Sequence, residues 1–192
     1  MDTPTLLGTR LDLVPLRVEH AEQLFPVLDP GVFAILVGRP REWSVDAFRG
    51  LLTSLCRDPG RMPFALWVKQ RGLLVGSSSL FDFRHEHRGV EVGSTWIARP
   101  WQGTFVNPEA KFLMLRHAFE GLGMLRVQFK TDLRNVQSQR ALEKLGCSRE
   151  GVLRKHMVLP DGHVRDSVYY SITNDEWPRI KQELLVRLAA LA

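Results

Sequence analysis

Cysteine is scarce in this chain, and long hydrophobic runs are missing. Two cysteines, Cys56 and Cys147, occur in 192 residues, far apart and each in a leucine-containing segment. This excludes a disulfide framework and indicates reduced, buried thiols. No apolar run approaches the roughly 18 residues of a membrane-spanning helix, and the opening Met1-Asp2-Thr3-Pro4 lacks the pattern of a signal peptide. We therefore expect a cytoplasmic protein.

Repeats, low-complexity tracts and linkers are also missing, so residues 1–192 are expected to form a single domain. The net charge of +5 and the pI near 9.6 favour an acidic partner. A phosphorylated cofactor satisfies this charge as well as nucleic acid does, and no aromatic–basic motif supports nucleic acid. His85-Glu86-His87 lies in a charged loop without further ligands at a recognised spacing, so we predict no metal site.

Hydrophobic periodicity predicts an α+β domain with a mainly antiparallel, mixed sheet of about seven strands. The helix that follows Asn107 crosses between the strand at Val90 and the strand at Arg126, which makes these two strands parallel neighbours. Ligands bind at the carboxyl ends of such strands. Strands are predicted over residues 10–16, 64–69, 73–83, 90–98 and 125–131 and in a hairpin over 151–171 that turns at Pro160-Asp161-Gly162. Helices are predicted over 19–28, after Ser44, after Asn107, after Asn135 and from Glu176 onwards.

The segment from Val90 to Lys111 carries the strongest functional signal. It predicts a strand, a sharp turn around Gly103 and a helix capped by Asn107, with Pro108 in the first turn. A strand that runs directly into a helix N-terminus gathers free backbone N–H groups at the positive end of the helix dipole, which favours an anion. However, Asn107-Pro108 is also a common helix start, and Lys111 is also compatible with a solvated position.

Four segments together resemble the GNAT acetyltransferase superfamily: EVGSTWIARPWQG, PEAKFLMLRHAFEGLGMLRVQFKTD, NVQSQRALEKLGC and REGVLRKH. Within it, the chain is most similar to the branch of ribosomal-protein-alanine N-acetyltransferases, over nearly its whole length. The resemblance implies a parallel strand pair that splays to form the cofactor cleft. It implies acetyl-coenzyme A (acetyl-CoA) as cofactor and direct transfer of the acetyl group to a primary amine, with a protein N-terminal α-amine as the first candidate.

The resemblance also indicates the cofactor-binding residues. Members of the family carry Gln or Arg, two residues, Gly, one residue, and then Gly or Ala, where backbone N–H groups meet the pyrophosphate. This chain has Gln102-Gly103-Thr104-Phe105-Val106-Asn107, in which Phe105 and Asn107 replace the two small residues and Phe105 adds bulk. We expect the anion to be held there partly by side chains, with binding residues Gln102, Gly103, Thr104, Asn107 and Lys111.

The helix after Asn135 supplies the expected catalytic acid. In the family, this helix approaches the thioester sulfur, and a Tyr or Ser protonates the departing thiolate, so Ser138 is the candidate. Asn135 is expected to hold the pantetheine arm, and Arg140 to meet a cofactor phosphate. A local capping pair formed by Asn135 and Ser138 explains both residue types equally well without a ligand.

The central strand supplies the expected general base. The amine must lose its proton before it attacks, and Glu91 is the carboxylate in this strand. Strict alternation places Glu91 on the same face as Thr95, in a polar pocket, whereas an exposed strand position is the alternative. A backbone N–H at Ile97 or Ala98 is expected to stabilise the developing oxyanion.

The final hairpin is expected to wall the acceptor pocket and select the substrate. Charged and histidine side chains surround its turn, including Arg154, His156, His163 and Asp166. Arg154 and Asp166 form a cross-strand ion pair in one interpretation, and Asp166 attracts a cationic acceptor in another. Two other functions stay open: acetylation of a small amine such as a polyamine or aminoglycoside, and non-catalytic acyl-CoA binding. Residues Leu184, Leu185, Leu188 and Leu191 of the last helix suggest a homodimer.

Overall fold

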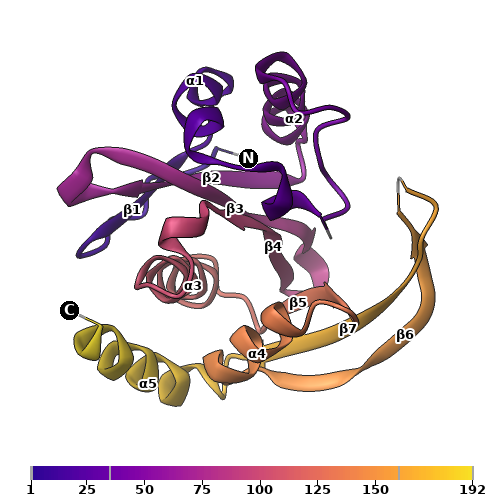
Figure 1. Cartoon of the computed structure of the whole chain (residues 1–192). Helices are drawn as coiled ribbons and strands as arrows, with labels where there is room; N and C mark the ends of the chain where they lie inside the picture. The colour runs from indigo at the N-terminus through magenta and orange to yellow at the C-terminus, as the bar shows by residue number, and fades with distance from the viewer. Residues whose placement is uncertain (1, 35, 160, 192) are drawn as a thin grey trace.

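The computed structural model describes residues 2–34, 36–159 and 161–191. Ile35 lies outside the described residues, and so does Pro160, which belongs to the predicted hairpin turn. Within them a seven-stranded sheet has the order β1-β2-β3-β4-β5-β7-β6, with β4 and β5 parallel and every other pair antiparallel (Figure 1). This confirms the predicted α+β class and the parallel pair. The strands are β1 Leu11–Pro15, β2 Arg61–Val68, β3 Leu73–Arg84, β4 Gly89–Ile97, β5 Arg126–Asp132, β6 Ser148–Val158 and β7 Val164–Thr173.

Helices cover both faces of the sheet (Figure 1). On one face lie α1 (Ala21–Leu24) and α2 (Val45–Arg57), and on the other lie α3 (Val106–Arg116), α4 (Val136–Leu145) and α5 (Trp177–Ala190). Ser44 caps α2 as predicted, because its Oγ accepts a hydrogen bond from the Ala47 N–H at 3.2 Å. The helix predicted over 19–28 is instead a short α1 between two 3₁₀ turns, since Pro26 cannot continue an α-helix. None of the described helices is long and apolar enough to cross a bilayer.

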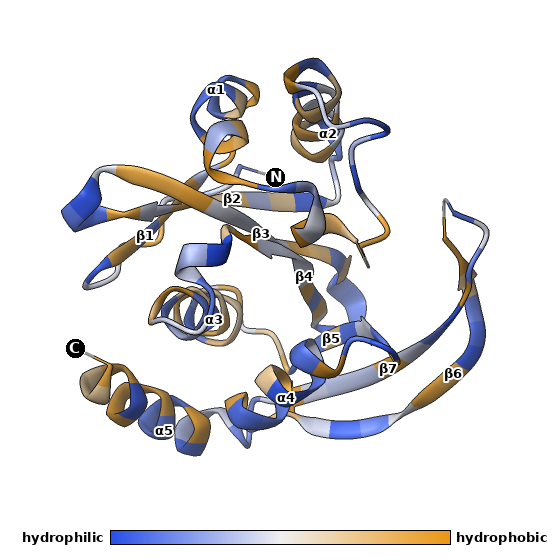
Figure 2. Cartoon of the chain, in the orientation of Figure 1, coloured by the Kyte–Doolittle hydropathy of each residue, from blue (hydrophilic) through white to orange (hydrophobic). Residues whose placement is uncertain are grey.

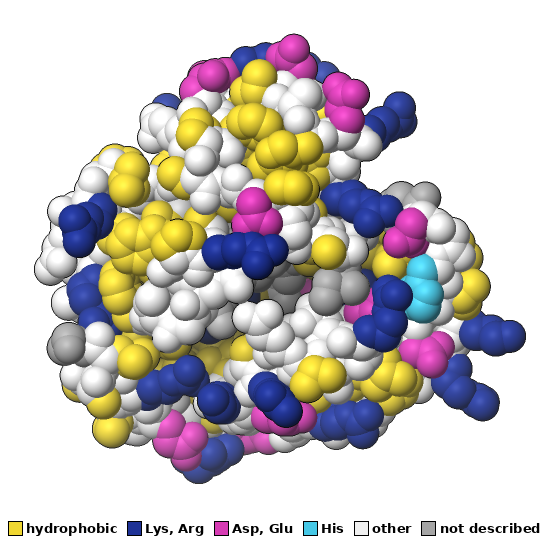
Figure 3. All heavy atoms as spheres, in the orientation of Figure 1, with side chains coloured by type: hydrophobic (Ala, Val, Ile, Leu, Met, Phe, Trp, Pro, Cys, Tyr) yellow, Lys and Arg dark blue, Asp and Glu magenta, His cyan; other side chains and the backbone are white. Residues whose placement is uncertain are grey.

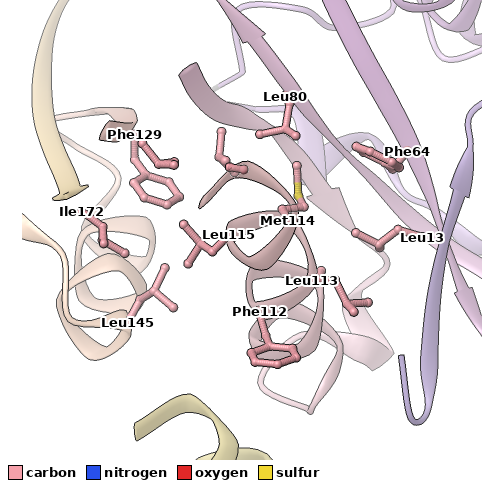
Figure 4. Packing of buried hydrophobic residues seen from close by; sticks show 14 of the residues in the cluster. Leu13, Phe64, Leu80, Phe112, Leu113, Met114, Leu115, Phe129, Leu145 and Ile172 are labelled. Atoms are coloured by element: carbon pink, nitrogen blue, oxygen red, sulfur yellow. The ribbon is translucent and has the colours of Figure 1, made fainter. Parts of the chain in front are cut away.

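Two hydrophobic cores hold these layers together. The larger core lies between the sheet and α3, where Leu113, Met114 and Leu115 pack among strand residues such as Leu13, Phe64 and Ile172 (Figure 4). The smaller core surrounds Phe48 and Trp96, between the sheet and α1 and α2. In Figure 2, the blue of hydrophilic residues marks the exposed turn between β2 and β3. Burial of each large apolar side chain stabilises the fold by about 1.5–3 kcal/mol. Because β4 and β5 pack into these cores, the cores fix where the ends of the two strands lie.

The apolar face of α5 is used within the chain. Leu184 is buried, and Leu188 packs against the larger core, while Trp177 at the start of α5 stacks on Phe119 of the segment after α3. Leu185 and Leu191 remain exposed. Intrachain packing therefore accounts for half of the leucines that suggested a homodimer, and the dimer stays a prediction.

The parallel strands β4 and β5 separate part-way along their length. Their pairing runs from Gly89 opposite Arg126 to Glu91 opposite Gln128 and then stops. Immediately beyond, Ser94 adopts a left-handed φ of 50°, and the register of β4 against β3 shifts at this point. Such a bulge inserts an extra residue and bends the strand, so β4 turns away from β5. The parallel pair is therefore splayed at its carboxyl end, as expected from the resemblance.

Candidate active site

The gap between β4 and β5 opens towards the N-terminus of α3. The loop before α3 turns at Gly103, whose φ of 75° favours glycine. Among the described residues, no backbone or side-chain acceptor takes the N–H groups of Gly103, Thr104, Phe105 or Asn107. Four unpaired N–H groups at the positive end of a helix dipole form a binding site for an anion.

The predicted cap of α3 at Asn107 is wrong. The helix begins one residue earlier, at Val106, and Asn107 is its second residue, although Pro108 does lie in the first turn. Thr104 provides the nearby acceptor instead: its Oγ1 accepts a hydrogen bond from the Val106 N–H at 3.3 Å and donates one to the Trp101 carbonyl oxygen at 2.8 Å. The Thr104 hydroxyl is thus used within the loop, whereas the half-buried Asn107 keeps its side-chain amide at the helix mouth.

Lys111 does not lie at this helix mouth. It is 7% exposed, and its Nζ donates hydrogen bonds to Thr95 Oγ1 at 2.8 Å and to Ser78 Oγ at 3.2 Å. Burial lowers the pKa of the Lys111 amine to about 8. Both the phosphate-side position and the solvated position expected from the sequence are wrong, because Lys111 comes more than one turn into α3 and faces β3 and β4.

Phe105 does not fill the gap between β4 and β5. Its ring packs edge-to-face on Trp101, with centroids 6.2 Å apart, and the Arg10 guanidinium carbon lies 4.3 Å from its centroid. Arg10 directly precedes β1, which forms the edge of the sheet opposite to β5 and its neighbours. The bulk that replaces the small family residue is therefore turned towards β1, and the loop backbone stays open to the gap.

Gln102 connects the N-termini of α3 and α4, the two helices that flank the gap. Its Nε2 donates a hydrogen bond to the Ile97 carbonyl oxygen at 2.9 Å, and its Oε1 accepts one from Gln137 Nε2 at 3.4 Å. Gln137 belongs to the first turn of α4. The N-termini of α3 and α4 therefore approach each other at the carboxyl ends of β4 and β5.

At the mouth of α4, Asn135 is the cap that the sequence predicts. Its Oδ1 accepts a hydrogen bond from the Ser138 N–H at 3.0 Å, while its own N–H donates to the Asp132 carbonyl oxygen at 2.9 Å. Capping thus explains Asn135 but not the Ser138 hydroxyl, which has no hydrogen-bond partner within the described chain. Arg140 is exposed two residues further on, roughly 200° around the helix from Ser138. Its contact with a cofactor phosphate stays a prediction.

The edge of β4 that faces the gap offers one of the two N–H groups expected from the sequence. The Ala98 N–H donates to the Val75 carbonyl oxygen of β3 at 2.8 Å, so Ala98 cannot donate into the gap. Ile97 pairs with Gly76 in the same ladder. Since neighbouring residues of an antiparallel strand alternate in the direction of their N–H groups, the Ile97 N–H points to the opposite side, towards β5. Of the two N–H groups predicted to stabilise the oxyanion, only that of Ile97 therefore remains a candidate.

Glu91 is buried at the point where the strands part. It is 3% exposed, and its Oε2 accepts a hydrogen bond from Gln128 Nε2 at 2.9 Å and lies 3.4 Å from Lys130 Nζ. The alternative that Glu91 occupies an exposed strand position is therefore wrong. The expected common face with Thr95 is also wrong, because the bulge at Ser94 interrupts the alternation: Thr95 bonds to Lys111 of α3, whereas the neighbours of Glu91 fill the α3-side core.

Polar side chains on the sheet face opposite α3 continue from Glu91 across β5, β7 and β6 and form a polar wall. His156 Nδ1 lies 3.0 Å from Ser167 Oγ, and burial, together with the nearby Lys130, lowers the pKa of the His156 ring, so it is neutral near pH 7. The Asp166 carboxylate accepts a hydrogen bond from the Lys155 N–H at 2.7 Å, and this contact replaces the expected ion pair with Arg154. Figure 3 shows the surface notched between the α1–α2 lobe and the β6–β7 hairpin, with charged side chains and a histidine around the notch.

Sequence reasoning missed two basic members of this wall, Lys130 and Arg165. Lys130 alternates with the core residue Phe129, and Arg165 has the same parity in β7 as Ser167 and Tyr169. A period-two reading of β5 and β7 would have placed both cations on the face opposite α3. The signal was present, but it depended on knowing which face of the hairpin was covered.

Comparison with known proteins identifies the family of this chain. Residues 10–148 match the family model described as the acetyltransferase (GNAT) domain. The chain belongs to the GNAT family. A crystal structure described as an acetyltransferase from T. thermophilus shares 42% identity with this GNAT protein and has a TM-score of 0.92, covering 98% of this chain and 99% of that one.

Two curated relatives carry activity names. An FsC-acetyl coenzyme A-N(2)-transacetylase of Aspergillus fumigatus is 29% identical over 96% of this chain and 82% of its own length. The Bacillus subtilis protein YdaF, assigned as a ribosomal N-acetyltransferase, is 32% identical over 55% of this chain and 57% of its own length. The protein is therefore an N-acetyltransferase of the GNAT family, and acetyl-CoA is its acyl donor.

Proposed function

We propose that this GNAT enzyme acetylates the α-amine of a protein N-terminus, as ribosomal-protein-alanine N-acetyltransferases do, by direct attack in a ternary complex. The observation that carries the proposal is the gap beyond Glu91 and Gln128, which lies between the mouths of α3 and α4. Similarity to YdaF supports a peptide acceptor.

The residues around the gap fit acetyl-CoA. The unpaired N–H groups from Gly103 to Asn107 would hold the pyrophosphate, with the Asn107 amide beside them. Gln102 and Asn135 flank the path of the pantetheine arm, and the Ile97 N–H is oriented to donate to a carbonyl oxygen in the gap. When bound, acetyl-CoA supplies a thioester carbonyl as the electrophile.

Proton transfer is assigned to residues on the two sides of the gap. Glu91 is the proposed base: its Oε2 is anchored by Gln128, and it accepts the amine proton directly or through water. Ser138 is the proposed acid, because its hydroxyl has no other partner in the described chain and sits at the mouth of α4. A thiol is a modest acid, so the assistance required from Ser138 is small.

Steady-state thiol release tests both the acceptor and the acid. Purified protein is assayed with acetyl-CoA against alanine- and serine-initiated peptides, spermidine and kanamycin. We expect peptide turnover, and we expect Ser138→Ala to lower kcat about 10- to 100-fold, near the lower end for general acid catalysis, with the KM for acetyl-CoA changed less than two-fold. Ser54→Ala, in an exposed turn of α2, is the matched control. An unchanged kcat in Ser138→Ala refutes the catalytic assignment.

A small amine is the second candidate acceptor. It is favoured by the relative from Aspergillus fumigatus, because that similarity extends over 96% of this chain. Turnover of spermidine or kanamycin with no turnover of any peptide would establish this candidate and exclude the first.

A further inference from the structure

Arg165 of β7 is a buried cation without a partner. The residue is 4% exposed, and its guanidinium makes no hydrogen bond or ion pair with any residue in 2–34, 36–159 or 161–191. Its Nε is out of contact with solvent and unsatisfied. Burial lowers the pKa of the Arg165 guanidinium, which still keeps its charge at any physiological pH. A buried, unpaired charge is strongly unfavourable unless a ligand completes it.

The two carboxylates whose charges act on Arg165 are already engaged by other side chains. Asp132 is held by Arg134, whose Nε and backbone N–H both lie within 3.1 Å of its carboxylate oxygen. Glu91 is held by Gln128 and lies 3.4 Å from Lys130. Both carboxylates act on Arg165 only as more distant charges. Of the three cations Lys130, Arg134 and Arg165, only Arg165 has no carboxylate partner among the described residues.

The position of Arg165 connects this unpaired charge with the acceptor side of the sheet. Arg165 shares its strand face with Ser167, which contacts His156, and with Tyr169, whose ring lies 5.8 Å from Lys130 Nζ. Lys130 reaches Glu91, the proposed base, at the start of the gap. The unsatisfied guanidinium therefore belongs to the same polar wall as the group that receives the amine proton.

On these grounds, and resting on the proposed amine acceptor, we propose that the acceptor bears a carboxylate within a few bonds of its amine and that Arg165 binds this carboxylate. A guanidinium presents a planar fork of donors that matches a carboxylate in a bidentate geometry. The carboxylate has two sources: the α-carboxylate of a free amino acid, or an acidic side chain next to a peptide N-terminus. Arg165 is then a specificity-determining residue, and the chemistry of transfer is carried by other groups.

Matched acceptor pairs test this proposal. L-Alanine, L-methionine and L-phenylalanine are each compared with their carboxamides, and amidated peptides that begin Ala-Glu are compared with peptides that begin Ala-Gln. The measured quantity is the ratio of kcat/KM for the charged and neutral members of a pair, in wild type and in Arg165→Met. Differences in intrinsic amine reactivity cancel between the two proteins. Arg179→Met on the exposed face of α5 controls for the loss of one positive charge.

We expect the ratio to fall about 10- to 100-fold in Arg165→Met for at least one pair type, as loss of a charge-assisted hydrogen bond predicts, and to stay unchanged in Arg179→Met. Dependence confined to the amino acids identifies the α-carboxylate, and dependence confined to the peptides identifies the side chain. Arg165→Lys, which keeps the charge but not the fork, should lose part of the preference. Equal ratios in wild type and in both Arg165 variants would overturn the proposal.

A binding measurement separates this proposal from the proposed function. N-acetyl-L-phenylalanine and its carboxamide form one pair of products, and the amidated peptides N-acetyl-Ala-Glu and N-acetyl-Ala-Gln form the other. None of them turns over, so each is added to the CoA-saturated wild type in a thermal unfolding experiment. We expect the charged member of at least one pair to raise the Tm more than its neutral partner, even if none of the amines is acetylated. If Arg165→Met does not fold, this wild-type comparison decides, and no difference within either pair would refute carboxylate binding.

Discussion

Replacing Lys111 with methionine tests how the buried amine beneath β4 affects stability. Methionine has a stem of similar length and no charge, so the main change is the loss of an ammonium group that is almost completely removed from solvent. Ser78 Oγ and Thr95 Oγ1 already lie 2.7 Å apart and stay paired with each other in the variant. The substitution therefore leaves neither hydroxyl without a hydrogen-bond partner, a loss that would destabilise the fold.

The magnitude follows from the pKa of Lys111. Burial lowers this pKa from 10.5 to about 8. A base whose folded pKa lies below its unfolded pKa destabilises the fold while both states are protonated, so Lys111 carries the full penalty below pH 8, and the penalty fades as the pH rises towards 10.5. The full penalty at pH 7 is about 3 kcal/mol, and about 1 kcal/mol of it disappears between pH 7 and pH 9.

Urea unfolding followed by tryptophan fluorescence measures this effect at pH 7 and pH 9. We expect Lys111→Met to be more stable than wild type at pH 7 and its advantage to shrink by about 1 kcal/mol at pH 9. Lys144→Met, at an exposed position of α4, should show no such pH dependence. Burial raises the pKa of the Cys147 thiol to about 12, and loss of the Lys111 charge raises this pKa further, so the folded thiol stays protonated at both pH values and its contribution cancels in the difference. An advantage that is equal at both pH values refutes the buried charge.

Two further substitutions test the segments on either side of the α3 mouth. Glu109→Ala should destabilise the fold by about 3 kcal/mol in the same unfolding assay, because the Glu109 Oε1 accepts hydrogen bonds from the N–H groups of Thr9 at 2.7 Å and Arg10 at 2.9 Å; a loss below about 1 kcal/mol contradicts this. Phe105→Ala should cost about 2 kcal/mol but leave the KM for acetyl-CoA within two-fold, since the ring faces Arg10; a markedly lower KM would mean that Phe105 obstructs the cofactor.

Periodicity and capping signals predicted most of the fold. The alternation of β5 and the caps at Ser44 and Asn135 follow from local chemistry, and the structure confirms them. The start of α3 was misjudged because Thr104 and Asn107 both suit a helix N-terminus, and sequence alone does not decide which oxygen reaches a free N–H.

The candidate site was predicted less completely, because it depends on tertiary geometry. One residue in a left-handed conformation, Ser94, reverses the alternation of β4 and separates Glu91 from Thr95. Lys111 was misplaced because α3 is buried on nearly all sides, which leaves no polar face for a lysine. Arg165 was not predicted as a site residue, because its lack of a partner depends on how β5 pairs with β7, which the sequence alone does not give.

We propose that acetyl-CoA occupies the gap between β4 and β5, with its phosphates at the N-terminus of α3. Amide chemical shifts of the ¹⁵N-labelled protein during titration with CoA test it most directly. We expect the largest saturable shifts at the unpaired N–H groups of Ile97, Gly103, Thr104, Phe105 and Asn107 and little change at Ala98, whose N–H is bonded to Val75. Saturable shifts that leave these five amides unchanged and appear elsewhere would contradict this placement of acetyl-CoA.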